Sequence, residues 1–183
     1  MKKGRLIGLY LALAFMAVKL IAWGFDFFVF EPIHPYVFFN MACLTVAIAL
    51  GLYFIKIKTL AESNLLLDIK NAMAVGMIYT VLIVGFLYIF YAYIHPNYSQ
   101  HLLQERKEFY ADKKNLAKLR QGNEEFRNKS DKEIREMEIE KAETILNPRN
   151  FAIISLLAMT LWSMLNSALI AIIYRRILFR NLT

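Results

Sequence analysis

Cysteine is almost absent from this chain of 183 residues, which contains only Cys43. A single cysteine excludes an internal disulfide framework and any metal site built from several cysteines. Because Cys43 lies inside an apolar run, we expect its thiol to pack as a small hydrophobic side chain. Other interactions must therefore hold the fold together.

Recognisable catalytic motifs are missing as well. The sequence has no Walker loop, no GxSxG nucleophile elbow, no Rossmann fingerprint and no paired carboxylates on a buried face. Acidic residues are scarce outside residues 95–150, which hold all but four of the fifteen. The sequence therefore predicts a protein that is not an enzyme, with no catalytic residue and no cofactor.

What the sequence does contain is long hydrophobic runs. Hydrophobic residues make up 58% of the chain, whereas soluble domains are nearer half apolar. Four runs, at residues 6–25, 36–55, 72–94 and 151–174, have the ~20 residues that a helix needs to cross a bilayer core. The first run lacks a clear cleavage site, so we expect a retained span rather than a signal peptide. The predicted fold is all-α, a single polytopic membrane domain over residues 1–183.

The charges predict the orientation of these spans. Lysine and arginine are absent from residues 26–35, while the termini and the connection at residues 56–71 hold nine basic residues against Glu62 and Asp68. Short loops rich in Lys and Arg stay on the cytoplasmic side. We therefore expect both termini in the cytoplasm and residues 95–150 in the periplasm of a bacterial inner membrane. The net charge of +7 is then mostly a topology signal, and no nucleic-acid partner is predicted.

Residues 95–150 read as a helical hairpin between the third and fourth spans. Apolar residues recur at helical spacing over residues 98–121, and Gln-Gly-Asn at 121–123 breaks the pattern. Ser130 and Glu133 match a capping box that begins a second helix, and Asn147-Pro148 ends it. Two interpretations stay open: a solvated lid whose apolar stripes pack on each other, or a docking surface for a partner protein. The mixed charge argues against a clamp for anionic lipid.

Small residues recur four apart in every span, at positions that the predicted topology places in the cytoplasmic half. Such stripes let helix backbones approach closely in lipid, whereas bulky aromatic residues occupy the outer halves. We therefore expect a bundle that is tight at its cytoplasmic end and wider outside. The predicted packing residues are Gly4, Gly8, Ala47, Gly51, Gly76, Ser163 and Ser167.

Three polar residues in the outer halves of the spans are candidate lipid-binding or ligand-binding residues: Lys19, Asn40 and Tyr88. An ionisable residue within a span favours a functional role, and Lys19 could bind an anionic group such as a lipid phosphate. The alternative is that Lys19 only extends its ammonium to the outer headgroups.

The three histidines, His34, His95 and His101, all fall on the predicted outer side. A zinc-like site can be drawn from them, but no specific ligand spacing such as HExxH is present. The competing interpretation is structural. His34 and His95 each precede a proline, and a residue before proline disfavours the α conformation, so each His-Pro pair marks a span boundary.

The sequence resembles the Domain of Unknown Function 4199 family, small four-span bacterial membrane proteins. The likeness covers most of the chain and rests on "YIHPNY" after the third span, on the charged hairpin, and on "LNPRNFAIISLLAMTLWSMLNSALIAIIYRR" near the end. The resemblance implies the four-span architecture and carries no assigned activity. As family-level context it also implies a helper role near polyprenyl-phosphate carrier lipids.

Two functions from different classes follow as expectations. The first is a non-enzymatic accessory or scaffold subunit that binds another membrane protein, or a further copy of itself, through its spans and hairpin. The second is a carrier or flippase-like helper that binds an anionic polyprenyl-phosphate lipid around Lys19. A metalloenzyme using the histidines is a third hypothesis, which a metal analysis of the purified protein would test.

Overall fold

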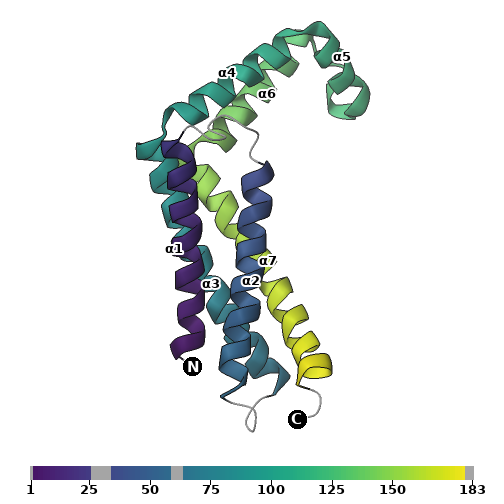
Figure 1. Cartoon of the computed structure of the whole chain (residues 1–183). Helices are drawn as coiled ribbons and strands as arrows, with labels where there is room; N and C mark the ends of the chain where they lie inside the picture. Colours follow the sequence, from purple (N-terminus) through teal and green to yellow (C-terminus); the bar gives the residue numbers. More distant parts are fainter. Residues whose placement is uncertain (1, 26–33, 59–63, 180–183) are drawn as a thin grey trace. The chain divides into compact units, whose positions relative to one another are not determined.

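The computed structural model describes residues 2–25, 34–58 and 64–179 (Figure 1). The described residues form helices, with no strand among them. Four of these helices are long and apolar enough to cross a membrane: α1 (Lys2–Gly24), α2 (His34–Lys56), α3 (Leu65–Ile89) and α7 (Pro148–Ile173). The prediction of an all-α protein with four membrane-spanning helices is therefore confirmed. The predicted outer loop, residues 26–35, lies mostly outside the described residues.

The chain forms two compact units. The first, called the bundle here, comprises Met1–Leu87 and Ile153–Thr183. It contains α1, α2, nearly all of α3 and most of α7, followed by the short π-helix η4 (Tyr174–Leu178). The second, called the hairpin, comprises Tyr88–Ala152 and begins with the π-helix η2 (Phe90–Ile94). Each unit has its own packing.

The third span begins earlier than the sequence pattern predicts. Its apolar run starts at Ala72, but α3 already begins at Leu65, which shortens the predicted connection of residues 56–71. The side chain of Asn64 accepts a hydrogen bond from the Leu67 amide at 2.8 Å, and such a cap satisfies an amide that the first helical turn leaves open. Asp68 in this first turn adds a negative charge where the helix dipole favours one.

Glycine lets the four helices of the bundle approach each other closely. A Cβ at Gly4 would lie 2.6 Å from the Gly51 carbonyl oxygen, and one at Gly8 would lie 2.6 Å from the Val75 carbonyl oxygen. A Cβ at Gly76 would overlap the Ser163 hydroxyl of α7. Ala47 is fully buried in the same unit. The small residues therefore lie at contacts between α1 and α2, α1 and α3, and α3 and α7.

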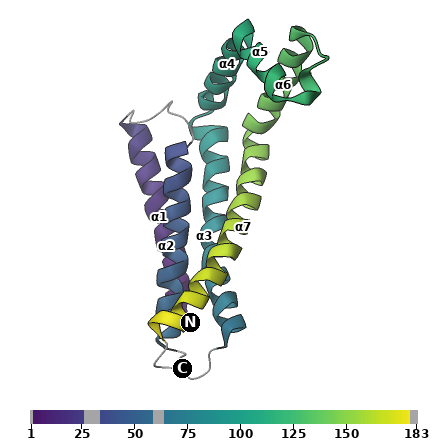
Figure 2. The ribbon, with the colours of Figure 1, turned by 90° about the vertical axis from the view of Figure 1, so that its right-hand side faces the viewer.

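The bundle has two ends, one where α1 begins and α7 ends and one where α1 ends and α7 begins (Figures 1 and 2). We call these the terminal end and the opposite end. The glycine contacts let neighbouring helices of the bundle approach each other, because backbones approach closely only where no side chain separates them. The interior between the ends is filled by apolar side chains, among them Leu44, Ile48, Leu52, Val75 and Ile83.

The hairpin contains α4 (Asn97–Ala111), α5 (Lys113–Gly122), the 3₁₀ turn η3 (Glu124–Phe126) and α6 (Asp131–Leu146). The sequence pattern predicts one helix over residues 98–121, but the chain bends at Asp112, which is extended with ψ of 118°. Its side chain accepts a hydrogen bond from the Lys114 amide at 2.9 Å. Asp112 thus caps a new helix instead of continuing the old one, since aspartate competes well for free amides at helix starts.

The hairpin has a small core of its own, formed by Tyr110, Leu116, Phe126 and Ile134. The predicted capping box is present: the Glu133 amide donates to the Ser130 hydroxyl, and the Glu133 carboxylate accepts from the Ser130 amide at 2.7 Å. Arg120 pairs with Asp131 at 2.6 Å across the connection between α5 and α6. These polar contacts therefore hold α5 and α6 around the core.

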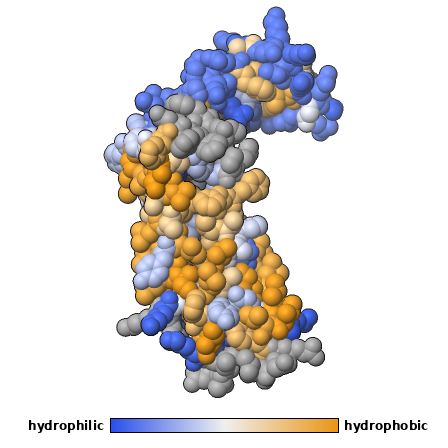
Figure 3. Space-filling view, viewed as in Figure 1, coloured by the Kyte–Doolittle hydropathy of each residue, from blue (hydrophilic) through white to orange (hydrophobic). Residues whose placement is uncertain are grey.

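The two units differ in the surfaces they present. Figure 3 shows mainly hydrophobic side chains on the visible face of the bundle and mainly hydrophilic ones on that of the hairpin. The exposed residues of α7 include Leu157, Leu161, Leu165 and Leu169, each at least 58% exposed. Such a face is stable in hydrocarbon and unfavourable in water. The chain is therefore a membrane protein with a hydrophilic helical hairpin.

We predict that Gly8→Ala destabilises the bundle, because its new methyl group would lie 2.6 Å from the Val75 carbonyl oxygen and that backbone atom cannot rotate away. Overpacking of this kind costs about 1–3 kcal/mol, so the thermal unfolding midpoint in detergent, followed by circular dichroism, should fall. The matched control is Gly24→Ala in the same helix, where a Cβ meets nothing within 4 Å. Equal midpoints for the two variants would contradict the close contact between α1 and α3.

Candidate functional site

Every buried polar or charged side chain of the described residues belongs to the bundle, and none belongs to the hairpin. They are Lys19, Asn40, Lys56, Asp68, Asn71, Thr80, Ser163 and Ser167. Polar side chains within membrane spans are costly, face the bundle interior, and mark candidate functional positions. Two groups of contacts among these residues, one toward each end of the bundle, form the candidate site.

The group at the terminal end contains a buried ion pair. The Lys56 ammonium on α2 lies 2.5 Å from the Asp68 carboxylate on α3, and the two side chains are 0% and 3% exposed. Arg175 of η4 approaches the same carboxylate oxygen at 3.7 Å. The ring of Phe179 lies 5.7 Å from the Lys56 nitrogen, so an aromatic side chain shields the pair. The end of α2, the start of α3 and the distant η4 therefore meet at one carboxylate.

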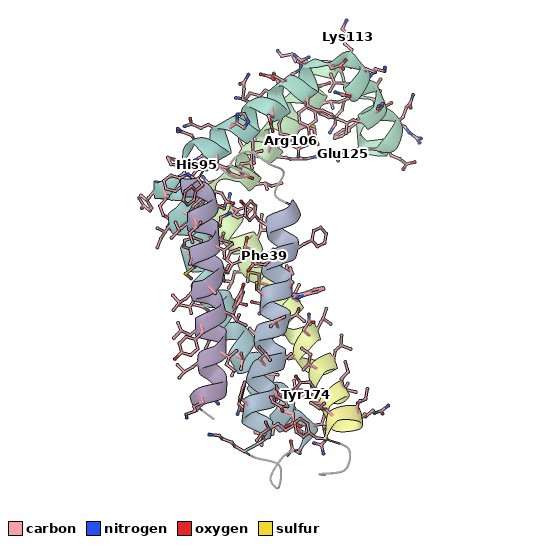
Figure 4. All side chains as sticks on the ribbon, in the orientation of Figure 1. Phe39, His95, Arg106, Lys113, Glu125 and Tyr174 are labelled. Carbon is pink, nitrogen blue, oxygen red and sulfur yellow. The ribbon has the colours of Figure 1, made fainter. Side chains whose placement is uncertain are left out.

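The aromatic residues around this ion pair extend the connection between α2 and η4. The Tyr174 hydroxyl donates to the carbonyl oxygen of Ala49 at 2.9 Å, and the Tyr53 and Phe179 rings lie 6.0 Å apart. Figure 4 shows Tyr174 at the terminal end. With two cations and one carboxylate, the group has a formal charge of +1. Its geometry suits a fixed structural connection, because the carboxylate already accepts a hydrogen bond from Lys56 and forms an ion pair with Arg175.

Sequence reasoning treated Lys56, Asp68 and Arg175 only as topology signals and did not bring them together. A signal was available in "LLLDIKNAMAVG", where Asp68 follows three leucines and precedes an apolar run. An acidic residue so close to a span needs a partner. The sequence could not show which of the nearby basic residues supplies it.

Toward the opposite end, Lys19 of α1 lies against α2. The side chain is 6% exposed, and its nitrogen lies 4.3 Å from the centroid of the Tyr36 ring. This is cation–π geometry, which stabilises an ammonium away from water. One turn further into the span, the Phe15 and Phe39 rings stack at 5.8 Å, and Figure 4 shows Phe39 toward this end of the bundle.

Asn40 joins three helices. Its side-chain oxygen accepts from the buried Tyr79 hydroxyl of α3 at 2.8 Å, and its nitrogen donates to the sulfur of Met159 on α7 at 3.4 Å. These bonds satisfy the amide from within the bundle. Tyr88, the third candidate, belongs to the hairpin unit, where its ring contacts that of Tyr93 at 6.3 Å. The structure thus brings Asn40 together with Tyr79, which sequence reasoning missed.

Three hydroxyl-bearing residues of α3 and α7 are buried in the bundle. Thr80, Ser163 and Ser167 are each at most 1% exposed, and their oxygens have no hydrogen-bond partner among the described residues. Ser163 lies against Gly76, so its hydroxyl occupies the space that the glycine leaves.

The histidines lie in unlike surroundings. His95 ends η2 and packs near the rings of Phe90 and Tyr98, at 6.2 and 5.6 Å, whereas His101 is half exposed and lies 3.4 Å from Glu105. The side chain of His34, at the start of α2, lies outside the described residues. Within the described ranges, no group of three or more His, Cys, Asp or Glu residues could hold a metal ion.

The hairpin carries an open groove of about 370 Å³. Phe109, Leu119 and Phe126 supply apolar surface, and Lys118 and Glu138 are charged lining residues of opposite sign. Burial, followed by the nearby Glu138, raises the pKa of the Tyr110 hydroxyl, which stays neutral and donates to Glu138 at 3.2 Å. Figure 3 shows apolar side chains interrupting the hydrophilic hairpin surface.

The comparisons with known proteins identify a family but no function. The chain matches the family described as "Protein of unknown function (DUF4199)" over residues 2–176, nearly its whole length. No curated protein and no solved structure matches the chain.

We predict strong coupling between Lys56 and Asp68. Asp68→Leu removes the carboxylate that pairs with Lys56 and Arg175 and should lower the free energy of unfolding by about 3–5 kcal/mol. Lys56→Met should cost less, because Arg175 still lies beside the carboxylate. The double variant should recover much of the loss, since removing both charges also removes the cost of burying them. Unfolding in detergent–denaturant mixtures measures all four corners of this cycle, and purely additive losses would contradict the pair.

We also predict that the first turn of α6 loses protection in acid. Hydrogen bonds from the Ser130 amide and hydroxyl lower the pKa of Glu133 below its usual value. The stabilisation is therefore present above the pKa of an unfolded glutamate and is lost as pH falls through the lower folded pKa. Hydrogen exchange, corrected for intrinsic rates, should show this loss between pH ~5 and ~3.

The variant Glu133→Gln supplies the test, because glutamine fits a capping box and does not titrate. Its protection in the first turn of α6 should be independent of pH over this range. Glu136→Gln, on the same helix, is the control and should follow the natural protein. A pH-dependent loss in Glu133→Gln as large as in the natural protein would assign the effect to another group.

Proposed function

The chain belongs to the DUF4199 family, and we propose that it is a non-enzymatic accessory subunit of the bacterial inner membrane. In this proposal it binds another membrane protein through its spans and its hairpin, which faces the periplasm. The observation that carries the proposal is the hairpin itself: a folded element with its own core, its own capping box and an open amphipathic groove.

The construction of the hairpin favours a binding element over a passive connection. A connection between two spans needs only a few residues, whereas this segment orders Tyr110, Leu116, Phe126 and Ile134 into a core. The side chain of Arg135 donates to the carbonyl oxygen of Tyr110 at 3.0 Å, which fixes α6 against α4. Ordering these groups costs conformational entropy, and a pre-ordered surface binds a partner without losing that entropy again.

The groove between α4, α5 and α6 is the part of this surface that best fits a protein segment. Its volume of about 370 Å³ matches pockets that hold a few side chains. The apolar ring of Phe109 is 46% exposed there, and Lys118 and Glu138 offer charges of both signs. A peptide carries donors, acceptors and charges of both kinds, whereas an anionic headgroup would favour a basic rim.

A lipid-carrier function remains the alternative proposal. Its support is the buried ammonium of Lys19 beside Tyr36. Two contacts favour the accessory function instead. The Asn40 amide already forms hydrogen bonds with Tyr79 and Met159. The Tyr88 ring contacts the Tyr93 ring within the hairpin unit.

We predict that Phe109→Asp removes a co-purifying membrane protein. The full-length tagged chain is purified in mild detergent from its own host, and bound proteins and lipids are measured together by mass spectrometry. Placing a charge in the apolar part of the groove should reduce the partner at least tenfold, since one well-packed aromatic contact contributes ~1.4 kcal/mol or more to binding.

Ile145→Asp is the matched control, because Ile145 is similarly exposed at 51% and does not line this groove. Its partner recovery should equal that of the natural chain, and circular dichroism should show both variants folded. Equal loss in both variants, or loss in neither, would reject the groove. Retained prenyl phosphate that disappears in Lys19→Ala, with no protein partner, would favour the carrier function.

A further inference from the structure

A polar network occupies the middle of the bundle on the face shared by α2 and α7, which cross in Figure 2. The Trp162 indole donates to the Thr45 hydroxyl at 3.1 Å, and that hydroxyl lies 3.4 Å from the Asn166 side-chain oxygen. Thr45 is one residue from the midpoint of the apolar helix Tyr36–Lys56. At 1.5 Å per residue, the network therefore lies near the centre of the hydrocarbon.

The network uses only part of the hydrogen-bonding capacity of the Asn166 amide. One of its N–H groups donates to the Trp162 carbonyl oxygen at 2.9 Å. The Thr45 hydroxyl has a single hydrogen, and the Met41 carbonyl oxygen at 2.9 Å competes for it better than Asn166 at 3.4 Å. An amide has two donors and an acceptor, so Asn166 keeps one donor and most of its acceptor capacity without a partner among the described residues.

This amide lies at the surface of the bundle rather than in its interior. Asn166 is partly exposed, and Trp162 beside it is 41% exposed. The same face of α7 continues with Leu169, 58% exposed, and Ile173, 48% exposed. Hydrocarbon offers no hydrogen bond, and tryptophan is enriched at membrane interfaces rather than at the midplane. Lipid alone is therefore a poor neighbour for this part of the surface.

We infer that this face binds a second copy of the chain, with the two Asn166 amides hydrogen-bonded to each other across a two-fold axis. An amide carries a donor and an acceptor on one group, so it is complementary to itself, as an interface with two-fold symmetry requires. Asparagine side chains bond across helices in lipid in this way. Leu169 and Ile173 supply the apolar contacts around the axis. This inference is independent of the hairpin function proposed above.

The first test measures self-association of the full-length chain in liposomes, by energy transfer between labelled copies at decreasing protein-to-lipid ratios. The natural chain should dimerise, and Asn166→Leu should weaken dimerisation about 3- to 20-fold, the range that interhelical hydrogen bonds in lipid support. Asn166→Gln keeps both hydrogen-bonding functions and should retain most of the association. Met164→Ala changes an exposed position about 160° around the helix from Asn166 and should leave the association unchanged.

A second test locates the axis without removing the amide. In a Cys43→Ser background, Leu169→Cys places a thiol about 60° from Asn166 around the helix, and Met164→Cys, at a position that is also exposed, places one about 160° from Asn166. Oxidation with copper phenanthroline in air should yield a disulfide-linked band at twice 21.3 kDa for Leu169→Cys only, since the bond requires Cα atoms within about 7 Å.

Three results would overturn the inference. The natural chain could stay monomeric at every protein-to-lipid ratio, or Asn166→Leu could dimerise as tightly as the natural chain while unfolding at the same temperature. Cross-linking could also occur equally at both cysteine positions or at neither. If the Asn166 face cross-links only to a different protein in native membranes, the surface belongs to a heteromeric contact and the second copy is rejected.

Discussion

The Lys56 ammonium and the Asp68 carboxylate lie 2.5 Å apart with almost no exposed surface, in a unit built from apolar helices. Neither charge has water to solvate it, so each depends on the other, on Arg175 and on the Phe179 ring. The pair is formed by the end of α2 and the start of α3, and Arg175 adds η4 after the last span. The same demand for internal partners governs Asn40, whose amide is satisfied by Tyr79 and Met159.

The two units of the chain place their polar and apolar side chains differently. The bundle has apolar side chains both inside and outside and keeps a few polar ones inside, and its helices make close backbone contact at Gly4, Gly8 and Gly76. The hairpin keeps a small apolar core inside and charges outside, as water requires. The surface of the bundle thus suits hydrocarbon and that of the hairpin suits water. A candidate binding surface is one where a polar group faces hydrocarbon or an apolar group faces water.

Two surfaces of this kind support the functional proposals. In the hairpin, the exposed Phe109 ring helps line an apolar groove within a charged surface. In the bundle, the amide of Asn166 is partly exposed where hydrocarbon is expected. The groove fits a protein segment of mixed charge, and the Asn166 amide fits an identical amide. We propose both as surfaces for association.

The sequence by itself determined the helical class, the four spans and the start of α6 at Ser130, because periodicity, run length and capping are local in the chain. It did not locate the start of α3 at Leu65, where the Asn64 cap extends the helix beyond its apolar run, nor the bend at Asp112. Tertiary structure alone decided that Lys56 meets Asp68, that Tyr79 meets Asn40, and that Asn166 keeps part of its amide at the surface. These facts depend on the rotation and depth of each helix against its neighbours, which side-chain packing sets and no local pattern records.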